Sequence, residues 1–68
     1  MKRYGLCKAI ESLTNGCEIE YNLIDQTYRV VDKDLNVIGY ITFDLFTKLL
    51  NTGTIHLQAQ HHLVRFYA

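Results

Sequence analysis

The sequence predicts a small α+β domain with two layers and the element order α-β-β-β-α-β-β. Two segments repeat apolar residues at the spacing of an amphipathic helix, and a segment between them alternates apolar and acidic residues with the period of a strand. The chain has 68 residues, which suits a single domain spanning residues 1–68. A domain of this size buries only about 60% of its unfolded surface, so we expect a second copy or a partner protein to add stability.

The first helix is expected over residues 5–14. Leu6, Ile10 and Leu13 recur there at positions i, i+4 and i+7 with Ala9 beside them, which is one apolar stripe. Asn15 and Gly16 follow directly, and Gly16 offers the left-handed conformation that ends many helices.

Three strands are expected in the middle of the chain. Residues 17–23 alternate apolar side chains with polar ones that include Glu18 and Glu20, so one face is apolar and the other acidic. Residues 28–31 and 37–41 have the composition of strands and are separated by a polar loop, which predicts a β-hairpin.

The second helix is expected over residues 43–51. Thr42 is a favourable N-cap, and Asp44 in the first turn suits the positive end of the helix dipole. The apolar stripe of this helix is wide and consists of Phe43, Leu45, Phe46, Leu49 and Leu50. Two closing strands are expected at residues 54–58 and 63–67.

The charges are balanced overall but unevenly distributed. Residues 1–16 carry three basic side chains against one acidic, whereas residues 17–36 carry five acidic against two basic. Proteins that bind nucleic acids are typically basic or carry a basic stripe, so DNA or RNA is not the first expectation. The acidic middle segment suits a basic protein surface.

No apolar run reaches the ~18 residues that a membrane span requires. Lys8 and Glu11 interrupt any apolar segment behind the basic start of the chain, so we expect no signal peptide and no membrane association. A cytoplasmic location is therefore expected, with Cys7 and Cys17 as reduced thiols.

No metal site and no cofactor are expected. His61 and His62 are adjacent and would point to opposite faces of a strand, and His56 alternates with apolar neighbours. The nine residues between Cys7 and Cys17 do not match the spacing of a zinc site. A calcium loop is also excluded: Asp32, Asp34 and Asn36 match its opening, but Val37 and Phe43 stand where it requires Gly and Glu.

No catalytic constellation is visible, and we expect the protein not to be an enzyme. Glu18 and Glu20 would lie about 7 Å apart on one strand face, a spacing at which two carboxylates can serve acid–base catalysis. No nucleophile motif or phosphate-binding loop accompanies them, so a solvated strand face is the better interpretation.

The aromatic residues point to an interface. Five Tyr and three Phe are more than a two-layer domain of this size is expected to bury. Phe46 and Phe66 are expected in the core. Tyr28, Tyr40 and Phe43 are expected at a protein-binding surface, because exposed aromatic side chains are preferred interface anchors.

Residues 41–55 resemble the end of a winged helix-turn-helix domain. In that family a Thr caps the recognition helix, spaced apolar residues pack it, and a Gly turns the chain into the wing. The matching residues are Thr42, Phe46, Leu49, Leu50, Gly53 and Ile55. The resemblance implies a winged-helix-like C-terminal half with residues 55–67 as the wing hairpin.

The chain departs from that family in front of this segment, where a hairpin over residues 28–41 replaces a helix. Small bacterial proteins of the YjhX type, toxins that act on DNA topoisomerase I, are similar in this respect. This resemblance and the small size, which is common among phage-encoded inhibitors, imply an inhibitor on a winged-helix-like scaffold.

Two functions follow as hypotheses. The first is a non-catalytic protein-binding inhibitor or adaptor, encoded by a phage or mobile element and directed at host or defence machinery; its expected contact residues are Tyr28, Tyr40, Phe43, Glu18 and Glu20. The alternative is a dimeric winged-helix regulator that binds DNA through Lys2, Arg3, Thr47, Lys48 and Asn51.

Overall fold

The computed structural model describes residues 2–60 and 63–68, and it confirms the predicted α+β class and element order. The elements are α1 (Leu6–Thr14), β1 (Glu18–Asn22), β2 (Thr27–Val31), β3 (Val37–Ile41), α2 (Phe43–Asn51), β4 (His56–Gln60) and β5 (Leu63–Tyr67). None of the helices in the described residues is long and apolar enough to cross a membrane.

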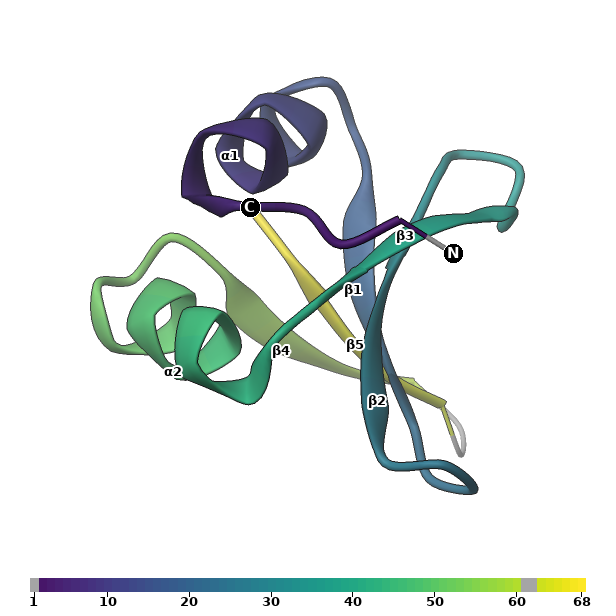
Figure 1. The fold of residues 1–68 in the computed structure, drawn as a ribbon. Coiled ribbons are helices and arrows are strands. Elements are labelled where there is room, and N and C mark those ends of the chain that lie inside the picture. The colour runs from purple at the N-terminus through teal and green to yellow at the C-terminus, as the bar shows by residue number, and fades with distance from the viewer. Residues whose placement is uncertain (1, 61–62) are drawn as a thin grey trace.

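The five strands form one antiparallel sheet in the order β3-β2-β1-β5-β4. The first three strands follow one another as neighbours. The chain then passes through α2 to the far edge, where β4 lies, and β5 returns between β4 and β1 (Figure 1). Residues 55–67 were expected to form a wing hairpin, and β4 and β5 do pair with each other, but β5 also pairs with β1 inside the sheet.

Both helices lie on the same side of the sheet, to the left in Figure 1. The core lies between them and the sheet and is centred on Ile19, which is fully buried and opposite Val30 on one neighbouring strand and Phe66 on the other. The other core residues are Tyr4, Ala9, Leu13, Ile41, Phe46, Leu49 and Ile55. The predicted burial of Phe46 and Phe66 is confirmed.

The helix α2 matches its predicted bounds, and its N-cap is confirmed because the Thr42 hydroxyl oxygen accepts a hydrogen bond from the Leu45 N–H at 3.2 Å. The next strand begins later than predicted, at His56 instead of residue 54. The reason is that the Thr54 and Ile55 N–H groups donate to the Leu49 carbonyl at the end of α2, and are therefore not free for the sheet.

The apolar stripe predicted for α1 is buried at two of its four residues, Ala9 and Leu13. Leu13 is buried as expected, but Leu6 and Ile10 are exposed. The buried face is centred on Ala9, which is fully buried.

Residues 2–4 add a short parallel pairing to β3, which the sequence did not predict. The Tyr4 N–H donates to the Tyr40 carbonyl at 2.8 Å, and the Tyr40 N–H donates to the Lys2 carbonyl at 2.9 Å. The segment thereby occupies the β3 edge at Tyr40 and places the Tyr4 ring in the core, against Gly39.

Candidate interaction surface

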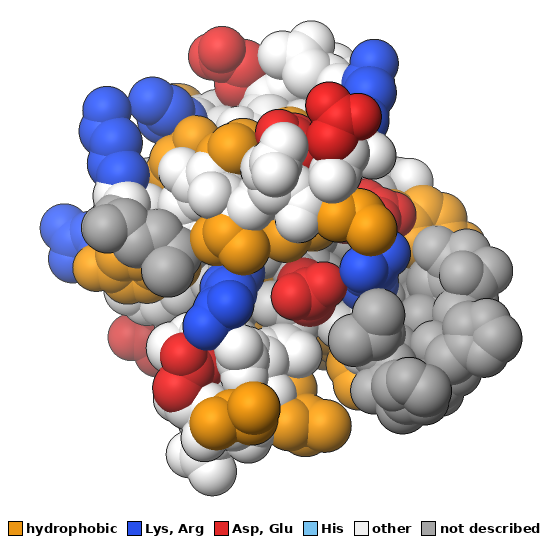
Figure 2. All heavy atoms as spheres, turned by 90° about the vertical axis from the view of Figure 1, so that its right-hand side faces the viewer, with side chains coloured by type: hydrophobic (Ala, Val, Ile, Leu, Met, Phe, Trp, Pro, Cys, Tyr) orange, Lys and Arg blue, Asp and Glu red, His pale blue; other side chains and the backbone are white. Residues whose placement is uncertain are grey.

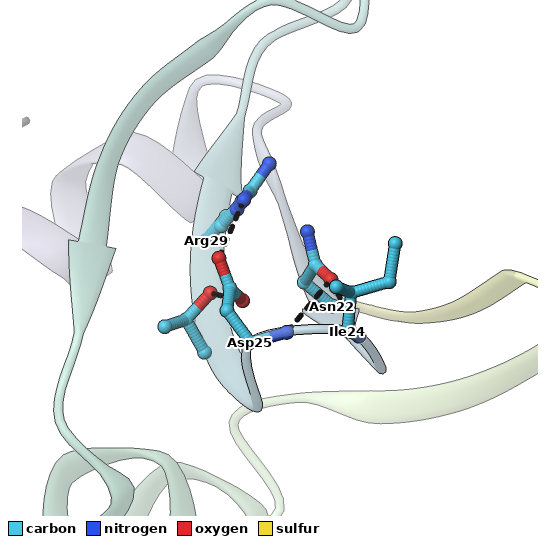
Figure 3. Close-up of polar contacts among 5 residues, drawn as sticks. Asn22, Ile24, Asp25 and Arg29 are labelled. Carbon is cyan, nitrogen blue, oxygen red and sulfur yellow. Dashed lines mark hydrogen bonds and ion pairs between the residues drawn. The ribbon is translucent and has the colours of Figure 1, made fainter.

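The tip of the β1–β2 hairpin is fixed by its own side chains. The Asn22 side-chain oxygen accepts hydrogen bonds from the Ile24 N–H at 2.8 Å and the Asp25 N–H at 3.4 Å. The Asp25 carboxylate accepts from the Thr27 hydroxyl at 2.6 Å and pairs with the Arg29 guanidinium at 2.9 Å (Figure 3). These bonds hold the turn from both of its ends.

The charge on Asp25 is favoured by this network. The hydrogen bond from Thr27 lowers the pKa of the carboxyl group, with a further contribution from Arg29. A carboxyl group with a lowered pKa stays ionised to more acidic pH, so the contacts that hold the tip persist at and below neutral pH.

The fixed tip presents two large apolar side chains to solvent. Leu23 is 65% exposed and Ile24 is 95% exposed, the largest exposure among the large apolar residues described. Isolated exposed apolar residues are common on soluble proteins, but two adjacent ones on an ordered turn form a ready contact point. We call Leu23 and Ile24 the hairpin tip.

Sequence reasoning missed the hairpin tip. The alternation over residues 17–23 predicts Leu23 on the apolar face of a strand, whereas β1 ends at Asn22 and both Leu23 and Ile24 lie exposed in the turn. The available signal was an apolar pair directly in front of the turn-like residues Asp25 and Gln26, where polar residues are usual. Gln26 completes the turn with φ of 58°, in the left-handed region.

Two of the predicted contact residues, Tyr28 and Phe43, lie together on the helix side of the sheet, with ring centroids 6.0 Å apart. The ring of Tyr21 also neighbours Tyr28, with the two ring centroids 4.9 Å apart. Phe43 is 60% exposed, whereas Tyr28 is partly buried. The ring of Tyr28 stacks on that of Phe46, with the centroids 4.1 Å apart. Burial raises the pKa of Tyr28, and the neighbouring Tyr21 adds to this shift.

The other predicted contact residues, Tyr40, Glu18 and Glu20, lie on the opposite, helix-free face. Tyr40 is opposite Arg29, Arg29 is opposite Glu20, and Glu20 is opposite Arg65, so these four form a row across the strands. Figure 2 views this side and shows acidic and basic side chains in alternation. The structure therefore divides the five predicted residues between two faces.

Glu20 is not a free carboxylate. It pairs with the Arg65 guanidinium at 3.3 Å, and both side chains are largely shielded from solvent. Glu18 lies opposite Val31 at the end of the same strand. The two carboxylates therefore differ in environment. Glu20 is paired with Arg65 on the sheet face, whereas Glu18 has the apolar Val31 as its cross-strand neighbour.

The residues expected to bind DNA are distributed over two elements. Lys2 and Arg3 belong to the segment along β3, and Lys48 and Asn51 are exposed on α2. The Thr47 hydroxyl donates to the Asp44 carbonyl within that helix at 2.9 Å. A side chain with its donor engaged in this way is less available to a nucleic acid.

No group of three or more His, Cys, Asp or Glu side chains that could hold a metal ion is found among the described residues. His56 is exposed at the start of β4, and His61 and His62 lie outside the described residues. Burial raises the pKa of Cys17, with a further contribution from Asp32, and a raised pKa opposes the thiolate form.

No protein-family model matches the chain, and neither a curated protein nor a solved structure does. The winged-helix resemblance therefore stays a prediction.

Proposed function

We propose that the chain is a non-catalytic protein-binding module that contacts its partner through the hairpin tip. The observation that carries this proposal is the exposure of Leu23 and Ile24 on a turn held by side-chain hydrogen bonds. An ordered turn loses little conformational freedom on binding, which favours affinity. Burying one such side chain in a partner contributes about 1.5–3 kcal/mol.

The exposed Phe43 provides a second contact point on the helix side of the same hairpin. Its ring borders Tyr28, which is stacked on Phe46. Aromatic side chains are typical anchors of protein interfaces. Phe43 therefore supports a protein partner and is a cleaner probe than Tyr28, whose removal would also disturb the core.

We further propose the role of an inhibitor or adaptor directed at a host or defence component, encoded by a phage or mobile element. This step rests on an analogy with small compact proteins of that kind. A cytoplasmic setting is part of the same proposal, and it is supported by the free thiols of Cys7 and Cys17.

The variant Ile24→Asn tests the hairpin tip. We expect the affinity for the partner, first captured from nuclease-treated bacterial lysate and then titrated by calorimetry, to fall at least about tenfold, because the burial lost exceeds 1.4 kcal/mol. Leu35→Asn is the matched control, since Leu35 is an exposed apolar residue in the other hairpin turn, with φ of 67°.

Equal affinities of the wild-type chain and Ile24→Asn would contradict the proposed contact. If Leu35→Asn lowers the affinity for the partner by the same factor, the loss does not depend on the hairpin tip, because any polar residue at an exposed turn would then have the same effect. Ile24 lies in an exposed turn, so the thermal midpoint of Ile24→Asn should stay close to that of the wild type. Leu35→Asn should be at least as stable as the wild type, because Asn adopts the left-handed conformation of position 35 more readily than Leu.

The DNA-binding regulator is the second candidate, and the exposure of Lys48 and Asn51 on α2 is the observation in its favour. We expect no binding of labelled random duplex DNA in fluorescence anisotropy at low salt, because the formal net charge is zero and Arg65 is paired with Glu20. Binding that weakens steeply with salt, and that Lys48→Glu removes, would place this candidate first.

A further inference from the structure

The two edges of the sheet differ in how they are protected. Residues 2–4 pair with the β3 edge at Tyr40, and β3 also contains an irregularity in its pairing with β2 between Val30 and Val31. The outer edge of β4 pairs with no other strand in the described residues. Its backbone N–H and C=O groups are therefore available to a further strand.

The strand β4 lacks the charges, prolines and bulges that protect many edge strands. The register of β4 with β5 is regular from the His56↔Tyr67 pair to the Gln60↔Leu63 pair. The sequence contains no Asp, Glu, Lys, Arg or Pro from residue 49 to residue 64, which includes the whole strand.

We propose that β4 pairs in antiparallel fashion with β4 of a second copy of this chain. Pairing over the full length of His56–Gln60 places position 58 opposite position 58 of the second copy. Leu57 then lies opposite position 59. An antiparallel pair of this kind has its two-fold axis perpendicular to the sheet, so one sheet of ten strands results, five from each copy, with the helices of both copies on the same side.

A second copy fits this edge better than a foreign strand. The edge carries no charge that would select a particular peptide, and a charge-free strand meets its own copy without repulsion. Leu57 is exposed at the edge, on the same face as its neighbour Phe66 in the core. A second β4 would shield Leu57 and extend the small core across the interface.

A charge exchange at position 58 tests the proposal. We expect the wild-type chain to dimerise with a Kd below about 1 mM in analytical ultracentrifugation. Gln58→Lys and Gln58→Glu should each weaken the dimer about fivefold, because each places like charges directly opposite one another. An equimolar mixture of the two variants should associate more tightly than either variant alone.

The matched controls are Asn51→Lys and Asn51→Glu, which introduce the same charges at an exposed position of α2. They should leave the dimer unchanged. Position 58 also lies opposite Arg65 in its own chain. An effect arising within one chain would therefore have opposite signs for Lys and Glu, whereas self-pairing weakens with both.

A wild-type chain that stays monomeric at protein concentrations up to about 1 mM would overturn the proposal. So would a dimer that responds to the position 58 charges no more than to those at position 51. If the position 58 variants fail to fold, amide hydrogen exchange of the wild-type chain decides. Protection of the β4 N–H groups must rise with protein concentration, and constant protection contradicts the pairing.

Discussion

Phe46→Ala is expected to lower the free energy of unfolding by about 3–5 kcal/mol, the range for removal of a buried Phe. Phe46 is only 7% exposed. Its ring centroid lies 4.1 Å from that of Tyr28 in a stacked pair and 4.8 Å from that of Phe66 in a T-shaped pair. It therefore joins α2 to strands β2 and β5. Domains have a stability of about 0.05–0.15 kcal/mol per residue, so this loss removes a large part of the total.

Phe43→Ala is the matched control, because it makes the same change in the same helix. Phe43 is 60% exposed, and we expect its removal to cost less than about 1 kcal/mol. Urea unfolding followed by circular dichroism measures both variants. Equal losses would mean that α2 packs through Phe43 as much as through Phe46, which contradicts the arrangement of the aromatic rings.

The sequence predicted the elements well because their signals are local. The five apolar residues of α2 and the Thr42 cap are read from adjacent positions, and the bounds of that helix were correct. Such a stripe does not specify which members are buried most deeply. Phe46 and Leu49 are buried while Phe43 is exposed, and this depends on where the sheet lies.

The order of the strands was not predictable in the same way. The insertion of β5 between β4 and β1 joins segments distant in sequence, as in the pair of Glu20 and Arg65. Alternation within a strand gives its two faces, but it does not name the neighbouring strand. The hairpin partners β2 and β3 were predicted because they are adjacent in the chain.

The hairpin tip was not predicted from the sequence, and the predicted contact residues are divided between the two faces of the sheet. Tyr28 and Phe43 were proposed as contact residues, and they lie together. Tyr40, the third aromatic residue predicted at an interface, lies on the other face, opposite Arg29. The register that separates Tyr28 from Tyr40 depends on the pairing of β2 with β3, which skips Ile38, and composition alone does not reveal such an irregularity.

The pairing of residues 2–4 with β3 gives the second large expected effect. Gly39→Ala is expected to lower the free energy of unfolding by about 3 kcal/mol, because overpacking is combined with the loss of backbone hydrogen bonds. A Cβ at position 39 would lie 2.7 Å from Cδ1 of Tyr4 and 2.8 Å from the Lys2 carbonyl oxygen. Neither atom has room to move unless the whole segment leaves the edge of β3.

The same change at Gly5 is the control, since a Cβ there meets no atom within 4 Å. Gly5→Ala should change the unfolding free energy, measured in urea, by less than about 1 kcal/mol.

A double-mutant cycle then identifies the cause of the destabilisation by Gly39→Ala. If the Tyr4 ring is the obstacle, Gly39→Ala must cost less in a Tyr4→Ala background than in the wild-type chain. An undiminished cost would assign the effect to the Lys2 carbonyl and to the backbone pairing itself. A Gly39→Ala variant as stable as Gly5→Ala would contradict the placement of residues 2–4 along β3, and with it the difference between the two sheet edges.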